Sequence, residues 1–309
     1  MNLLAWTVLA MMTVGHAAGP TDDLVRQALD RFPSSTANLE FCNVSKMRPL
    51  PAYAALRQRF LGAEMQQLVA SLETLGVRDE DVDRLALGAG PVADRPGLEL
   101  YGIAEGRFKP SDITARARAA GMDPLVVNGY PVYCFGGDAA ARCFAILDPA
   151  RGVFGSRDMI DYMLYADAGT DSLAKVPLVT ARVAHPPADA SVWGIATGPA
   201  VAEWVNVVMP MPAEGQNSLA PVLASVVSIS YEVRAGQNVA LSADLACTNA
   251  ESAARLRQSL DAARALQQFA WRTMRPDVPN PYERLAFSAQ GSQLQFRATM
   301  DYDALGLKK

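Results

Sequence analysis

The same order of strand-like and helix-like segments occurs twice along the 309-residue chain. Each copy reads strand, helix, strand, strand, helix, strand, which is the order of the ferredoxin-like split fold. An antiparallel sheet with helices on one face is the simplest way to bury the apolar stripes of such helices. The sequence therefore predicts an α+β fold of two duplicated ferredoxin-like halves, residues 19–175 and 176–309.

The predicted elements follow from apolar periodicity and from turn residues. In the first half we expect helices at 21–32, 51–75, 110–120 and from 156, and strands at 37–43, 83–90, 98–106, 126–128 or 130–135, and 143–147. A Pro-rich connector at 175–189 separates the halves. In the second half we expect strands at 191–197, 226–234, 239–247, 285–289 and 293–299, and helices at 199–208 and from 249.

The last helix has its own signals. Thr248 and Glu251 fit a capping box, in which each side chain bonds a backbone N–H at the helix start. Three- and four-residue spacing predicts one buried stripe along the helix. That stripe consists of Leu256, Leu260, Ala263, Leu266, Ala270 and Met274.

Residues 1–18 are predicted to be a cleaved signal peptide. Residues 3–14 are apolar and uncharged, and Gly15 and Ala17 place small residues before the expected cleavage site. The run is shorter than the ~20 residues that span a bilayer. The segment before it has no Lys or Arg, so an uncleaved N-terminal anchor is the alternative. We expect a periplasmic or secreted protein with no transmembrane span after signal removal.

The four cysteines of an exported chain favour disulfides over metal sites. Cys134 and Cys143 flank a turn between two predicted strands, so their sulfurs should face each other across a hairpin. Cys42 and Cys247 then pair by elimination and would join the halves. Two free buried thiols are the alternative for that second pair.

Composition and residue counts argue against several kinds of chemistry. The net charge is −4, whereas a nucleic-acid partner normally requires a basic face. Only His16 and His185 are present, and His16 would leave with the signal, so a mature monomer has no histidine triad or multi-histidine metal site. We expect no catalytic residues, cofactor or metal. A hydrolase that uses carboxylates or a Ser–Lys pair is a weaker alternative.

Other segments offer candidate functions beside plainer interpretations. Met209 and Met211 lie in a Pro-rich loop that could form an apolar lip for a partner. Trp193, Trp204 and Trp271 could line a ligand pocket, although their places in strands and helices favour core packing. The acidic run at 79–83 lacks the Gly and Glu of a calcium loop and is interpreted as a solvated turn.

The chain resembles a group of uncharacterised exported bacterial proteins with two similar α+β halves. The resemblance lies in Leu98-Glu99-Leu100-Tyr101-Gly102-Ile103-Ala104-Glu105-Gly106-Arg107-Phe108 and in Val153-Phe154-Gly155-Ser156-Arg157. It implies an export signal and the duplicated architecture, and it implies no activity, ligand or functional residue.

These observations lead to a first hypothesis and one main alternative. The first is a non-enzymatic exported protein that binds an envelope protein or ligand through a sheet face or a loop. The alternative is a small-molecule or lipid binder with a groove between the halves, which requires a cavity of a few hundred Å³.

Overall fold

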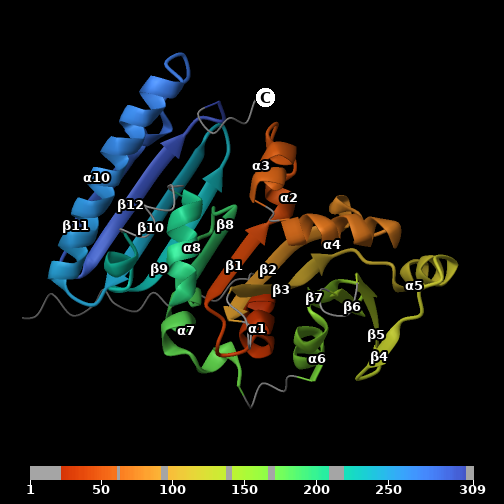
Figure 1. The fold of residues 1–309 in the computed structure, drawn as a ribbon. Helices are drawn as coiled ribbons and strands as arrows, with labels where there is room; N and C mark the ends of the chain where they lie inside the picture. Colours follow the sequence, from red (N-terminus) through yellow and green to blue (C-terminus); the bar gives the residue numbers. More distant parts are fainter. Residues whose placement is uncertain are drawn as a thin grey trace, which may run out of the picture.

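The computed structural model describes residues 22–60, 63–91, 97–136, 141–165, 171–208 and 219–303. The predicted signal peptide and Met209 and Met211 lie outside these residues. The described chain is a mixed α+β fold built on one antiparallel sheet of 12 strands (Figure 1). The strand order is β11-β12-β10-β9-β8-β1-β2-β3-β7-β6-β5-β4.

Along the chain, helices separate single strands from runs of two to four consecutive strands. The strands are β1 Asn38–Asn43, β2 Val82–Pro91, β3 Leu98–Gly106, β4 Leu125–Val127, β5 Tyr130–Phe135, β6 Arg142–Asp148, β7 Arg151–Gly155, β8 Val192–Thr197, β9 Val226–Ala235, β10 Val239–Cys247, β11 Leu285–Gln290 and β12 Gln293–Met300. The α-helices are α1 Asp22–Arg31, α2 Val44–Met47, α3 Tyr53–Phe60, α4 Ala63–Thr74, α5 Pro110–Ala119, α6 Arg157–Tyr165, α7 Pro177–Val183, α8 Pro199–Val208 and α10 Ala250–Met274. Short 3-10 turns are η1 Asp79–Asp81, η2 Leu173–Lys175 and η3 Pro281–Arg284.

Helices cover both faces of the sheet. On one face, α1, α6 and α7 bury a core that includes Leu39 and Phe41 of β1 and Trp193 and Ile195 of β8. The other face carries two separate helix layers. One layer consists of α4 and α5 and packs on β3, β5, β6 and β7. The other layer consists of α8 and α10 and packs on β9, β10, β11 and β12. The middle of this second face, around β1, therefore lies between two layers.

The prediction of two separate ferredoxin-like sheets is wrong. β1 pairs with β2 on one side and with β8 on the other, so the strands of both predicted halves form one sheet. A ferredoxin-like half requires strands that cross over and lie parallel, whereas each strand pair in the described chain is antiparallel. The boundary between residues 175 and 176 stays a prediction.

The cysteines divide into a bridged pair and two free thiols. Cys134 and Cys143 lie directly opposite each other on β5 and β6 and form the predicted disulfide. The predicted Cys42–Cys247 bridge is wrong, because both thiols are free. β8 and β9 separate β1 from β10, which places the two strands about 14 Å apart at the usual spacing of ~4.8 Å per strand. A disulfide requires Cα atoms within about 7 Å.

The long helix α10 follows its prediction in the first turns only. Asn249 caps it by accepting a hydrogen bond from the Ser252 N–H at 2.8 Å, in place of the predicted Thr248. Leu256 and Leu260 are buried as predicted, whereas Leu266 and Met274 are each 72% exposed. The buried side continues through Gln267 and Trp271, which keeps the helical period. Among the described residues, no helix is long and apolar enough to cross a membrane.

The Cys134–Cys143 bridge should stabilise the fold by restricting the unfolded chain. Replacing both residues by Ser should lower the free energy of unfolding by roughly 2.5 kcal/mol, the entropy of closing a short loop. Urea unfolding measures this loss, and reductant should reproduce it in the wild type. Cys247→Ser keeps the bridge and should remain sensitive to reductant. Insensitivity of the wild type to reductant, or a mapped Cys42–Cys247 peptide, would contradict the assignment.

Candidate functional site: an apolar cavity with a polar floor

A cavity of about 860 Å³ lies between the two helix layers of the second sheet face. Its floor is β1 with its neighbours β2 and β8, and its walls come from α3 and α4 on one side and from α8 and the end of α10 on the other. Most of the lining is aliphatic or aromatic. Met65, Leu68 and Leu72 belong to one wall, and Trp204, Val207 and Trp271 to the other.

The alternation of side chains along β1 places polar groups on the floor of the cavity. Successive side chains of a strand point to opposite faces, so Leu39 and Phe41 enter the core of the first face. Asn38, Glu40 and Cys42 therefore point into the cavity. Phe41 stacks on Trp193 with ring centroids 4.4 Å apart, which fixes the strand from behind. A carboxylate thus occupies the middle of a central strand.

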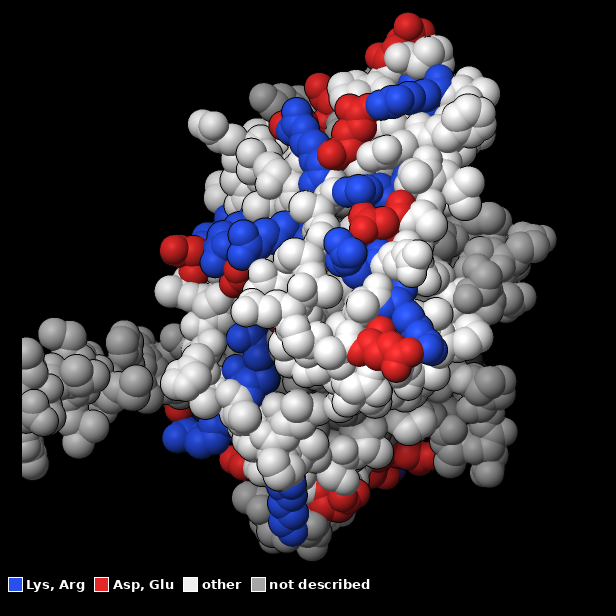
Figure 2. All heavy atoms as spheres, turned by 90° about the vertical axis from the view of Figure 1, so that its left-hand side faces the viewer, with Lys and Arg blue, Asp and Glu red and all other residues white. Residues whose placement is uncertain are grey.

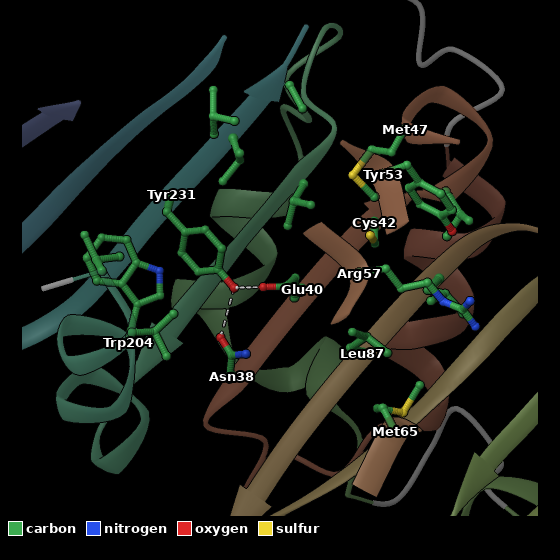
Figure 3. Close-up of a pocket in the computed structure, with 18 of the residues that line it drawn as sticks. Asn38, Glu40, Cys42, Met47, Tyr53, Arg57, Met65, Leu87, Trp204 and Tyr231 are labelled. Carbon is green, nitrogen blue, oxygen red and sulfur yellow. Dashed lines mark hydrogen bonds between the residues drawn. The ribbon is translucent and has the colours of Figure 1, made fainter. Parts of the chain in front are cut away.

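Tyr231 of β9 reaches Glu40 across the intervening strand β8. Glu40, Gly194 and Tyr231 lie in one register row over β1, β8 and β9. The Tyr231 hydroxyl donates to Glu40 Oε2 at 2.7 Å and lies 3.3 Å from Asn38 Oδ1 (Figure 3). A Cβ on Gly194 would lie 2.8 Å from the Tyr231 hydroxyl oxygen and 2.3 Å from the Leu39 carbonyl oxygen. The phenol ring therefore requires glycine beneath it.

Burial governs the protonation of this group. Glu40 keeps part of its surface open to the cavity, but protein surrounds it. Loss of water raises the pKa of the Glu40 carboxyl, and the hydrogen bond from Tyr231 lowers it by a smaller amount. Burial also raises the pKa of the Tyr231 phenol, and the nearby Glu40 charge raises it further. Tyr231 is therefore a neutral hydrogen-bond donor at physiological pH.

Cys42 is two residues beyond Glu40 on the same face of β1. Burial raises the pKa of its thiol well above the ordinary range, and the Glu40 charge adds to the effect. Only the thiolate is a good nucleophile or metal ligand. Cys42 therefore lines the cavity as a small apolar group with little reactivity at neutral pH.

An ion-pair cluster closes the cavity wall at α3. The Tyr53 hydroxyl donates to Asp79 Oδ1 at 2.8 Å, and the Nε atoms of Arg48 and Arg57 each lie 3.4 Å from an Asp79 carboxylate oxygen. The interpretation of the acidic run as a fully solvated turn is therefore wrong for Asp79, whose side chain is 23% exposed. Its carboxylate fixes α2 and α3 to η1 beside the cavity.

The candidate residues named in the sequence analysis lie in different parts of the structure. Trp193 packs in the core of the first face, as predicted. Trp204 and Trp271 line the cavity, as the pocket interpretation expected. Cys42 also lies in the cavity, whereas Cys134 and Cys143 form a hairpin bridge elsewhere. Among the described residues, no group of three or more His, Cys, Asp or Glu side chains could hold a metal ion.

Sequence reasoning missed Glu40, Asn38 and Tyr231. One signal was present, because Asn38 to Cys42 alternates polar with apolar side chains. Such alternation is usually typical of a strand with one solvated face. In β1, however, the polar side of the alternating pattern lines the cavity between the helix layers rather than a solvated surface.

The outer surface at α10 has a mixed character. Figure 2 shows positive and negative side chains interspersed with a broad uncharged area on the face that carries this helix. Leu266, Phe269 and Met274 of α10 belong to the exposed apolar side chains, at 72%, 73% and 72% exposure. Leu266 and Phe269 face away from the buried side of the helix, whereas Met274 also lines the cavity, on the same side of the helix as Trp271.

Comparisons with known proteins give a fold and no family. No protein-family model and no curated protein matches the chain. Two crystal forms of the protein TP0453 have similar structures. Form I is 11% identical, with a TM-score of 0.51, and the match covers 90% of this chain and 94% of that chain. Form III is 10% identical, with a TM-score of 0.51, over 90% and 95%. At these identities, the similarity concerns the fold alone.

Replacing Gly194 by Ala should displace Tyr231 from Glu40. The new Cβ would meet the backbone oxygen of Leu39, so we expect a loss of roughly 1–3 kcal/mol in unfolding free energy, as for an overpacked core. Gly236→Ala is the matched control, because a Cβ there meets open space. Urea unfolding of both variants checks the prediction. Equal stability of the two variants would show that Tyr231 does not depend on Gly194.

Replacing Glu40 by Gln should change how stability depends on pH. Because the folded-state pKa of Glu40 is raised, the folded chain holds one more proton than the unfolded chain between the ordinary and the raised value. Wild-type stability should fall across that window by up to about 1.4 kcal/mol per pH unit, and the variant should lack this loss. The variant's relative stability should therefore rise with pH and then level off.

Urea unfolding between pH 4 and pH 9 measures the difference between Glu40→Gln and the wild type. Glu251→Gln, at an exposed i,i+4 pair, is the control, and it should shift stability by less than about 0.5 kcal/mol throughout. A difference for Glu40→Gln that stays constant over the whole range would contradict the raised pKa.

Proposed function

We propose that this protein is a non-enzymatic, exported binding protein that holds an apolar small molecule or lipid in the cavity between the two helix layers. The cavity carries the proposal. Its volume of about 860 Å³ falls within the ~300–1,000 Å³ of typical ligand sites, and apolar walls with a few polar groups are characteristic of such sites. A groove of this kind is what the alternative hypothesis from the sequence requires.

The chemistry of the lining favours binding over catalysis. Its polar floor offers a carboxyl group, an amide, a phenol and a thiol. The phenol and the thiol have raised pKa values, so neither is activated as a nucleophile. His185 is not among the lining residues. Hydrolases that use carboxylates place two carboxyl groups around the reacting bond, whereas the hydrogen-bond partner of Glu40 is the Tyr231 phenol.

The disulfide supports an extracytoplasmic location. Structural disulfides persist mainly in oxidising compartments, and the bridge joins Cys134 and Cys143 of adjacent strands. Export through a cleaved signal at residues 1–18 is the route that we propose. Binding of an envelope protein through the loop that holds Met209 and Met211 stays a prediction, since those residues lie outside the described chain.

The proposal predicts that a larger side chain in the cavity weakens binding of an apolar probe. N-phenyl-1-naphthylamine, which fluoresces strongly in apolar surroundings, should bind the wild type and be displaced by long-chain compounds. Leu87→Trp should weaken this binding at least about tenfold, because Leu87 lines the floor and a larger ring would occupy the space of the probe.

Leu178→Trp is the matched control, since Leu178 is 41% exposed on α7 and lies outside the cavity. Fluorescence titration of the three proteins, with their thermal unfolding recorded in parallel, makes the comparison. Absence of probe binding to the folded wild type, or equal binding to both Trp variants, would overturn the proposed function.

A further inference from the structure

Among the described residues, Glu40 has no counter-charge in the cavity. Its Oε2 accepts the hydrogen bond from Tyr231, and no described residue donates to its Oε1. The groups that shift its pKa include no arginine or lysine. Buried carboxylates in proteins are normally paired with a cation, because an unpaired one has lost its hydration without compensation.

The surroundings of Glu40 are suited to a donor rather than an acceptor. Asn38 Oδ1 lies beside the Tyr231 hydroxyl, whose single hydrogen is directed to Glu40. Trp204 lies next to Tyr231, with ring centroids 5.5 Å apart (Figure 3). Carboxylate and amide oxygens near aromatic rings suit a group with several N–H donors, a positive charge and no acceptor.

The arginines that line the cavity have other partners. The Nε of Arg57, at the α3 wall, is paired with Asp79. Figure 3 shows its guanidinium directed away from Glu40, toward the outer wall. Arg78 is paired with Glu80, and the guanidinium carbon of Arg275 lies 5.1 Å from the centroid of the Trp271 ring. The cavity therefore has a carboxyl group without a counter-charge on its floor, and its arginines already have other partners.

On the basis of the proposed function, we propose that the molecule held in the cavity is an apolar compound with a protonated amine, and that this amine forms an ion pair with Glu40 on the floor. The ammonium donates to Oε1 and supplies the missing positive charge, while its apolar body lies along Leu87 and Val192. An amphiphile with an anionic group at that end is disfavoured, because two like charges would meet in apolar surroundings.

Binding of the amine should be coupled to a proton. In the empty cavity burial raises the pKa of Glu40, and an adjacent ammonium lowers it again by favouring the charged form. Besides Glu40, the titratable and charged groups that line the cavity are Cys42, Tyr53, Arg57, Arg78, Asp79, Glu203, Tyr231, Arg275 and Tyr282. Amine binding should therefore weaken as the pH falls and Glu40 retains its proton.

Three ligands of equal chain length test the inference by isothermal titration calorimetry: decylamine, decanol and decanoate. At pH 7.5 the wild type should bind decylamine at least about tenfold more tightly than either other compound, the usual size of a hydrogen bond to a charged group. Glu40→Gln should reduce this preference to within about twofold. Glu232→Gln, on the same strand as Tyr231 and outside the cavity, should retain it.

The two tryptophan variants locate the ligand. Leu87 lines the same floor, so Leu87→Trp should weaken decylamine binding, whereas Leu178→Trp, outside the cavity, should leave it unchanged. In the wild type the preference for decylamine should also decline between pH 7.5 and pH 5, which tests the role of Glu40 without a substitution if Glu40→Gln fails to fold.

The outcomes distinguish this inference from the proposed function. Decanol or decanoate binding as tightly as decylamine, or an undiminished preference in a folded Glu40→Gln, would overturn the amine while the naphthylamine probe still binds. Failure of the probe and of all three decyl compounds would overturn the binding function itself.

Discussion

The fold depends on the pairing of β1 with β8. This contact joins the N-terminal and C-terminal strands into one sheet, and it places β1 between β2 and β8 rather than at an edge. A strand in that position has a hydrogen-bonded neighbour on each edge. Leu39 and Phe41 fill one core, and the other face of β1 becomes a floor between two helix layers that do not close over it.

The floor is held by an arrangement that spans three strands. Tyr231 reaches Glu40 because Gly194, directly between them, has no side chain. A carboxyl group in such a position destabilises the fold unless it is protonated or paired. A leucine at position 40 would pack with Leu87, and no hydration of a polar group would be lost. In binding sites generally, a polar group among apolar walls fixes the orientation of a ligand and makes the site selective.

The sequence identified local structure well and long-range pairing poorly. The Cys134–Cys143 hairpin was predictable because a turn joins its strands and their register follows from the turn. The partner of β1 was not, because no local pattern links Asn38 to Ala196. The duplicated order of elements was compatible with two small sheets, and only the pairing partner excludes them.

The same limit explains the errors at α10 and β1. Leu266 was assigned to the buried stripe because it is apolar, although the helical period leads through Gln267, Trp271 and Met274. Met274 lines the cavity while it remains 72% exposed. For β1, the polar and apolar residues alternate, but an enclosed polar face and a solvated one have the same sequence pattern.

The distance along the chain between β1 and β8 also has a consequence for folding. Hairpins such as β5–β6 and β9–β10 join strands that are neighbours in sequence, whereas Asn38 must meet Ala196 across more than half of the chain. Closing such a long loop loses entropy before any native contact compensates for it, and contacts of this kind slow folding. The cavity floor is complete only once β1 and β8 have paired, so a nascent chain lacks the full cavity until its second half has been synthesised.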